Sequence, residues 1–122
     1  MKVLIVDDNS EIRRMLRRLL ADLSTDIFEC SDGGEVLSAY TRQHPDWVLM
    51  DIEMGQLDGI TATRQIRAVD PVAHILIVTS HGNPALRAAA QAAGACGYVL
   101  KENLMEIRQW LTAEPNSGLK LA

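Results

Sequence analysis

Carboxylates, hydroxyls and one lysine stand at the ends of four short apolar runs of this chain. They are Asp7 and Asp8 after the first run, Asp51 after the third, Thr79 and Ser80 after the fourth, and Lys101 after the fifth. Crowded carboxylates repel one another, and a hard divalent cation such as Mg²⁺, which prefers oxygen ligands, relieves that repulsion. A lysine ammonium pairs with phosphate, and a hydroxyl donates to a phosphoryl oxygen. These residue types predict a site that holds Mg²⁺ and a phosphoryl group beside a carboxylate, which can itself be the nucleophile.

Five β-rich runs alternate with segments of helical periodicity. The runs span residues 2–6, 26–30, 47–51, 74–79 and 97–100, and most of them are continuously apolar, as in strands that are covered on both faces. Every gap repeats apolar residues at helical spacing, and after the third run these are Ile60, Thr63, Ile66 and Val69. We expect an α/β, flavodoxin-like fold: a doubly wound five-stranded parallel sheet in the order 2-1-3-4-5, with five helices.

That strand order explains why the polar residues matter together. The second strand, which ends in Cys30 and Ser31, lies at an edge, and the other four strand ends are neighbours about 4.8 Å apart. Doubly wound sheets bind ligands at the carboxyl ends of their strands. We therefore expect the acids, the hydroxyls and the lysine to share one pocket.

Several residues predict where helices begin and end. Asn9 or Ser10 is suited to cap the first helix. Asn83 is suited to cap the fourth, Pro84 fits its first turn, and Gly94 is a typical stop.

The composition limits the class of protein. A length of 122 residues favours one domain, which we place at residues 1–113, with 114–122 as a linker start or tail. The net charge of −4 argues against direct nucleic-acid binding by this domain. No apolar run is long enough to cross a membrane and no signal peptide is evident, so we expect a cytoplasmic protein without membrane contact. Cys30 and Cys96 lack the spacing of a metal or redox motif.

Nucleotide binding is disfavoured. The chain has no phosphate-binding loop of the Walker type and no G-x-G-x-x-G after the first strand. The first turn, "VDDNS", offers two aspartates where a nucleotide or FMN site would offer backbone amides to an anionic phosphate.

Four motifs together resemble one known family. "VLIVDDN", "VLMDIEMGQLDG", "ILIVTS" and "GACGYVLK" are similar to the receiver domains of two-component response regulators, over residues 2 to about 113. The resemblance implies that Asp51 is the phosphoacceptor and that Mg²⁺, or Mn²⁺ in its place, is held by Asp8, Asp51, the backbone carbonyl of Glu53 and, through water, Asp7. It implies that Lys101, Thr79 and Ser80 bind the phosphoryl group, that Tyr98 switches with Thr79, and that Glu53 and His81 tune the dephosphorylation rate.

The resemblance also implies partners. A sensor histidine kinase or phosphotransfer protein would supply the phosphoryl group, and a homodimer could form through the fourth helix, fifth strand and fifth helix. The output would be a regulatory one, such as transcription, and no enzyme activity is expected beyond self-phosphorylation and autodephosphorylation. Some receivers of LuxR-type regulators resemble this chain in having an acid after the lysine, here Glu102.

The sequence departs from the family pattern at two places. Gly55 stands where a proline usually follows the methionine, here Met54, and we expect a more mobile loop there because glycine is conformationally permissive. Glu102 stands where the family often has a proline that follows a cis bond, and a cis bond before a residue other than proline is costly.

Two other functions stay open at this point. One is a Mg²⁺-dependent phosphohydrolase of the haloacid-dehalogenase type, although such enzymes want a second Asp where this chain has Glu53. The other is a degenerate receiver that serves only as a scaffold. Labelling with a phosphodonor separates these from a working receiver.

Overall fold

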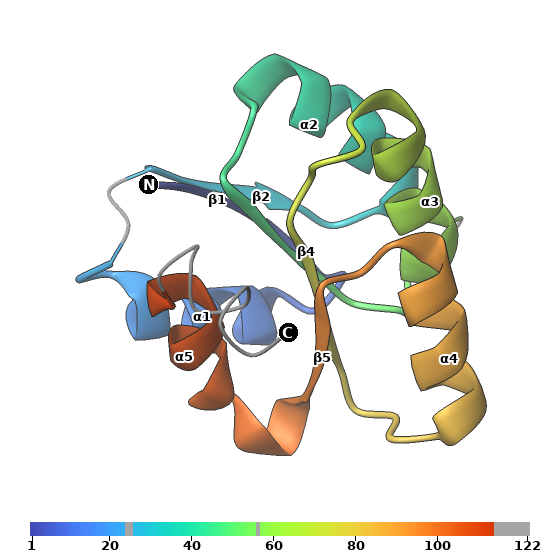
Figure 1. Ribbon diagram of the computed structural model, residues 1–122. Helices are drawn as coiled ribbons and strands as arrows, with labels where there is room; N and C mark the ends of the chain where they lie inside the picture. Colours follow the sequence, from blue (N-terminus) through green and yellow to red (C-terminus); the bar gives the residue numbers. More distant parts are fainter. Residues whose placement is uncertain (24–25, 56, 114–122) are drawn as a thin grey trace.

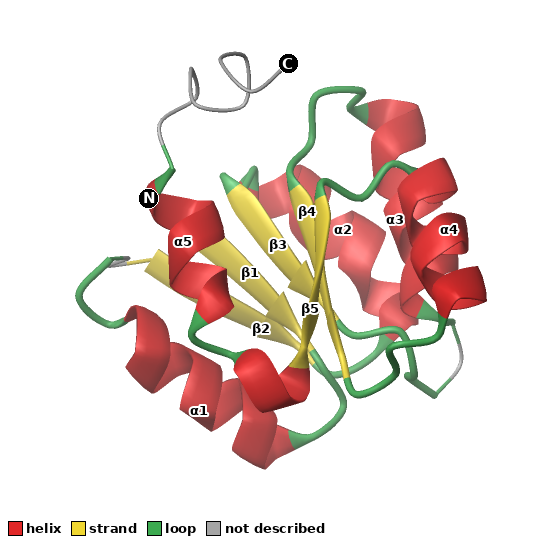
Figure 2. Ribbon diagram, turned by 60° about the horizontal axis from the view of Figure 1, so that its bottom comes forward, coloured by secondary structure: helices red, strands yellow, loops and turns green. Residues whose placement is uncertain are grey.

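The chain forms one parallel sheet of five strands, as predicted. A computed structural model describes residues 1–23, 26–55 and 57–113. The sheet has the order β2-β1-β3-β4-β5, and every pairing between neighbours is parallel (Figure 2). Its strands are β1 (Lys2–Val6), β2 (Asp26–Cys30), β3 (Trp47–Met50), β4 (Ile75–Thr79) and β5 (Gly97–Leu100).

Five α-helices cover the two faces of this sheet. They are α1 (Ser10–Leu20), α2 (Val36–Gln43), α3 (Gly59–Val69), α4 (Pro84–Ala93) and α5 (Glu106–Thr112), with short 3-10 turns at Gly33–Glu35 and Lys101–Asn103. Helices α1 and α5 lie on one face, and α2, α3 and α4 lie on the other (Figures 1 and 2). Two apolar clusters follow, one around Ile5, Leu16 and Ile107, and one around Leu4, Ile66 and Ile77.

The helix ends have the predicted chemistry. The side chain of Asn9, rather than Ser10, caps α1 by accepting from the N–H groups of Glu11 and Ile12. Asn83 caps α4 in the same way, Pro84 is its first residue, and Gly94 ends it with a φ of 109°, in the left-handed region that glycine tolerates.

Element boundaries differ slightly from the prediction. β3 ends at Met50 and β4 begins at Ile75, so Asp51 and His74 lie just outside their strands. Val69, expected on the apolar face of α3, is 58% exposed because it is the last residue of that helix, where the helix has passed the edge of the core.

Some expectations fall outside what the structure tests. No helix in the described part of the chain is long and apolar enough to cross a membrane. The predicted tail, residues 114–122, lies outside the described residues, so the division at residue 113 stays a prediction.

Candidate functional site

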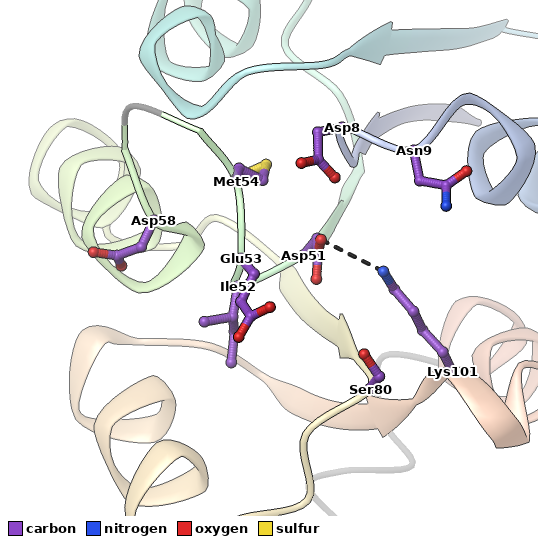
Figure 3. A pocket seen from close by; sticks show the side chains of 9 residues that line it. All are labelled: Asp8, Asn9, Asp51, Ile52, Glu53, Met54, Asp58, Ser80 and Lys101. Carbon is purple, nitrogen blue, oxygen red and sulfur yellow. Dashed lines mark ion pairs between the residues drawn. The ribbon is translucent and has the colours of Figure 1, made fainter.

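The carboxyl ends of four neighbouring strands surround one open pocket of about 540 Å³ (Figure 3). Its lining comes from the β1–α1 loop, the β3–α3 loop, the end of β4 and the end of β5, and consists of Asp8, Asn9, Asp51, Ile52, Glu53, Met54, Asp58, Ser80 and Lys101. Because β1, β3, β4 and β5 are neighbours in the sheet, the residues that follow them meet at one edge, although they are as far apart in the chain as Asp8 and Lys101. The sequence predicted this pocket from the strand ends alone.

Three aspartates form the acidic centre of the pocket. Asp7 and Asp51 are buried and Asp8 is exposed, and one carboxylate oxygen of each lies within 4.8 Å of the others. Burial, with the charge of Asp7 as the second cause, raises the pKa of Asp51 to about 6, against the opposing effect of Lys101. The cluster therefore holds more negative charge than Lys101 alone balances.

Lys101 reaches this cluster from the end of β5. Its Nζ lies 2.9 Å from Oδ2 of Asp7 and 3.4 Å from Oδ2 of Asp51. Burial lowers the pKa of Lys101, but its hydrogen bond to Asp7 and the two carboxylate charges outweigh this, and the net shift is upward. The sequence assigned Lys101 to a phosphoryl group, and in the structure the lysine lies closer to Asp7 than to Asp51.

Local backbone contacts set the position of the acids. The N–H of Asn9 donates to Oδ1 of Asp7 at 2.9 Å, and the N–H of Asp51 continues the sheet by donating to the carbonyl of Val6 at 2.9 Å. Gly59 begins α3 directly beneath Asp51, where a Cβ would lie 1.9 Å from the Asp51 carbonyl oxygen. A glycine is thus required here by the close approach of α3 to Asp51 and not by a positive φ, which Gly59 does not have.

A second group of predicted residues lies around the end of β4. Thr79 is fully buried, and its Oγ1 accepts the N–H of His81 at 3.4 Å. The hydroxyl of Tyr98 donates to the His81 carbonyl at 2.6 Å, and the Arg87 guanidinium lies 4.5 Å from the centre of the Tyr98 ring. One loop residue, His81, therefore contacts both Thr79 and Tyr98.

The two residues assigned to rate tuning contact each other. Nε2 of His81 lies 2.8 Å from Oε1 of Glu53, with side-chain exposures of 45% and 72%, so the pair lies in solvent at the pocket mouth. Ser80 lines the pocket and is exposed. The position of His81 two residues after Thr79 predicted its place near the mouth, but the sequence gave no signal that Glu53 and His81 would pair.

The departures from the family pattern leave the pocket intact. Gly55 is exposed, has no atom within 4 Å of the place its Cβ would occupy, and does not have a positive φ. The peptide bond between Lys101 and Glu102 is trans. The expected mobility of the loop at Gly55 stays a prediction.

Four lining residues were missed by sequence reasoning as parts of the site: Asn9, Ile52, Met54 and Asp58. Asp58 caps α3, with its Oδ1 accepting the Thr61 N–H at 2.8 Å. An Asp before a helical apolar pattern was the available signal for that cap. Ile52 and Met54 both follow Asp51 in the β3–α3 loop, where apolar residues carry no comparable signal.

The donor set fits a hard divalent cation. The carboxylates of Asp7, Asp8 and Asp51 are oxygen ligands, which Mg²⁺ and Mn²⁺ accept, and the cluster contains no sulfur or imidazole donor that would favour a softer metal. The open pocket leaves room for water ligands, which Mg²⁺ retains. These acids could therefore hold such an ion with the rest of its shell supplied by solvent.

The raised pKa of Asp51 predicts a pH effect on the metal-free protein. The native state holds this proton up to about pH 6 whereas the unfolded state releases it near 3.8, so native stability falls as the pH rises through this window. Asp51→Asn removes the buried charge, and we expect it to raise the free energy of unfolding by about 1–3 kcal/mol at pH 7.5. Urea unfolding at pH 7.5 and 4 checks this, and a gain that is as large at pH 4 would contradict it.

Known proteins share both the sequence and the fold. A family model described as the response regulator receiver domain matches residues 3–112. A chemotaxis protein CheY from Halobacterium salinarum is 40% identical over 100 residues, which cover 82% of this chain and 83% of that protein. The response regulator MprA of Mycobacterium leprae is 34% identical over 87% of this chain but only 46% of its own length.

A solved structure agrees. The crystal structure of a LuxR-family two-component response regulator from Aurantimonas sp. SI85-9A1 has a TM-score of 0.81 and 37% identity, and the match covers 90% of this chain and 84% of that one. The fold is the CheY-like form of the flavodoxin-like fold, with five parallel strands in the order 2-1-3-4-5. Since the family model spans nearly the whole described chain, this chain belongs to the response regulator receiver domain family.

Proposed function

We propose that this receiver takes a phosphoryl group from a histidine kinase or phosphotransfer protein onto Asp51, with Mg²⁺ as cofactor. The observation that carries the proposal is the setting of Asp51: a buried carboxylate at the centre of an acidic pocket, 3.4 Å from Lys101. In-line attack requires a positioned carboxylate and cations that balance the charge of the phosphoryl oxygens. Both requirements are matched by side chains that come from different strands.

Each residue of the pocket has its own role in the proposed reaction. Asp8, Asp51 and the Glu53 carbonyl would hold Mg²⁺, with Asp7 acting through water, and the ion would neutralise the acids and the phosphoryl oxygens. A carboxylate oxygen of Asp51 attacks phosphorus, the phosphorus–nitrogen bond of the donor phosphohistidine breaks, and the imidazole leaves with that electron pair. Lys101 then exchanges a carboxylate partner for a phosphoryl oxygen.

The signal passes through the second group of residues. Thr79 and Ser80 would donate hydroxyls to the phosphoryl group, and movement of Thr79 would alter the His81 loop to which Tyr98 is bonded. The surface formed by α4, β5 and α5 would then change its affinity for a dimer mate or an output partner. Glu53 and His81, paired across the mouth, would govern the access of hydrolytic water.

We place this domain in the cytoplasm, as a signalling module that is phosphorylated and dephosphorylates itself but has no other enzyme activity. Relatives such as MprA are response regulators of greater length, and a transcriptional output, including one of the LuxR type, is part of the proposal. The domain itself would not contact DNA.

Intact mass spectrometry after incubation with a small phosphodonor tests the proposed chemistry. We expect one phosphoryl group per chain, stable in acid and labile in base, which forms in the presence of Mg²⁺ and does not form when the metal is chelated beforehand. Labelling that needs no divalent cation would contradict the proposal. Sustained turnover of generic phosphoesters would favour the phosphohydrolase, and no labelling at all would favour the scaffold.

Lys101→Ala is expected to separate phosphorylation from switching. Asp51 and the metal-binding acids remain, so labelling should persist, but the phosphoryl group loses the cation that couples it to the end of β5. The amide NMR shifts of Thr79 and Tyr98 on phosphorylation report the switch, and they should be much smaller than in the wild type. Glu102→Ala, the exposed neighbour, is the matched control, and normal shifts in Lys101→Ala would refute the assigned role.

A further inference from the structure

Arg13 of α1 contacts the β1–α1 loop, which carries Asp7 and Asp8, but does not itself line the pocket. Its Nη1 donates to the main-chain carbonyl of Asp7 at 2.7 Å, and its Nε donates to Oε1 of Glu29, also at 2.7 Å. The Arg13 side chain is only 18% exposed. One guanidinium therefore joins the edge strand β2 to the peptide that links Asp7 with Asp8.

The Asp7 carbonyl needs this donor because the sheet ends beside it. The Asp7 N–H donates to the carbonyl of Cys30 at 3.1 Å, and Cys30 is the last residue of β2. In an extended strand the N–H and C=O of one residue face the same neighbour, so the Asp7 carbonyl points just past the end of β2. A main-chain carbonyl in a partly buried position requires a partner, and Arg13 supplies it.

Glu29 fixes the orientation of Arg13. Its second oxygen, Oε2, accepts from Nε of Arg17, whose Nη2 also donates to the carbonyl of Ile27 at 3.0 Å. The hydrogen bond from Arg17, and then that from Arg13, lower the pKa of Glu29. A charged carboxylate held by two guanidinium groups keeps the Arg13 side chain in one conformation.

Asp8 depends on this arrangement more than its neighbours do. Asp7 is held through its side chain by Asn9 and Lys101, whereas among the described residues no hydrogen bond holds the Asp8 carboxylate. Figure 3 shows that carboxylate directed into the pocket beside Asp51. Its direction is therefore set by the Asp7–Asp8 peptide, whose oxygen Arg13 holds.

We propose that Arg13, oriented by Glu29, is a positioning residue that fixes the Asp7–Asp8 peptide and so holds the Asp8 carboxylate toward Asp51 before a cation binds. This inference rests on the proposed function of the acids as metal ligands. Residues that orient metal ligands typically change metal affinity by about 10–100-fold when they are replaced.

Calorimetric titration of the protein with Mg²⁺, without phosphodonor, tests the proposal. Arg13→Met keeps the apolar stem and removes the guanidinium, and we expect it to weaken Mg²⁺ binding by about tenfold or more. Arg17→Met is the matched control: it removes a guanidinium from the same helix and the same Glu29 but not from Asp7, and we expect less than about a threefold effect. Arg13→Lys, which cannot reach both acceptors, replaces Arg13→Met if that variant proves unfolded in a thermal melt.

A metal-free measurement separates this proposal from the function on which it rests. Amide NMR relaxation should show a lower order parameter at Asp8 in Arg13→Met than in the wild type or in Arg17→Met. An unchanged Asp8 amide, wild-type Mg²⁺ affinity in Arg13→Met, or equal losses in both variants would overturn the proposal. If the wild type itself binds no Mg²⁺, the proposed function fails, and the relaxation data still decide whether Arg13 orders the loop.

Discussion

Asp51→Asn is expected to abolish phosphoryl labelling. The amide keeps the size of the buried side chain but is a poor nucleophile, and the three-aspartate cluster loses one anionic ligand. The measurement is intact mass after incubation with a small phosphodonor and Mg²⁺, and labelling should fall below detection. Retained labelling would show that the phosphoryl group resides elsewhere.

Asp58→Asn is the matched control for that variant. It makes the same chemical change in the same pocket, but Asp58 serves α3 as its N-cap, and asparagine caps helices equally well. We expect labelling close to that of the wild type. Loss of labelling in both variants would point to the net charge of the pocket, rather than to Asp51, as the determining property.

Gly59→Ala is expected to cause a large loss of stability. The new Cβ would lie 1.9 Å from the Asp51 carbonyl oxygen, 2.8 Å from its carbon and 2.9 Å from Cγ of Met50. Two of these atoms are backbone and cannot rotate away, so the start of α3 and the Asp51 loop must separate. Overpacking typically costs about 1–3 kcal/mol, and we expect about 3 kcal/mol or more here, measured by urea unfolding.

Gly55→Ala adds the same methyl group, but we expect it to raise the stability of the protein rather than lower it. No atom lies within 4 Å of the added Cβ, and the backbone there does not have a positive φ. Alanine allows the unfolded chain fewer backbone conformations than glycine does, so the variant should be more stable by about 0.4–1 kcal/mol. If Gly59→Ala lost less than about 0.5 kcal/mol, or if both variants lost the same amount, the close approach of α3 to Asp51 would not control stability.

The sequence predicted the fold well because its signals were local and repeated. Short β-rich runs, most of them continuously apolar, marked all five strands, and Asn83, Pro84 and Gly94 marked the two ends of α4. The strand order brings Asp8, Asp51, Ser80 and Lys101 to one pocket, whereas Asp7 and Thr79 are buried and do not line it.

Contacts between side chains and distant backbone atoms could not be predicted. No pattern in the sequence marks a partner for the arginines of α1, yet Arg13 reaches the carbonyl of Asp7, just after β1, and Glu29 of β2. Glu53 and His81 pair, and Tyr98 bonds to the His81 carbonyl, only because two loops approach each other across the pocket. Such contacts depend on loop paths and rotamers, which have no periodic signature in the sequence.

The residues of the site follow both central strands and an edge strand of the sheet. The acids lie at the ends of β1 and β3, each hydrogen-bonded on both sides, whereas Lys101 follows β5, which pairs only with β4. Edge elements open with less free energy than central ones in native-state fluctuations. Peeling of β5 would withdraw the lysine and leave the three aspartates in place, so a partly unfolded form opened at β5 should keep its acidic cluster and lose the lysine that pairs with it.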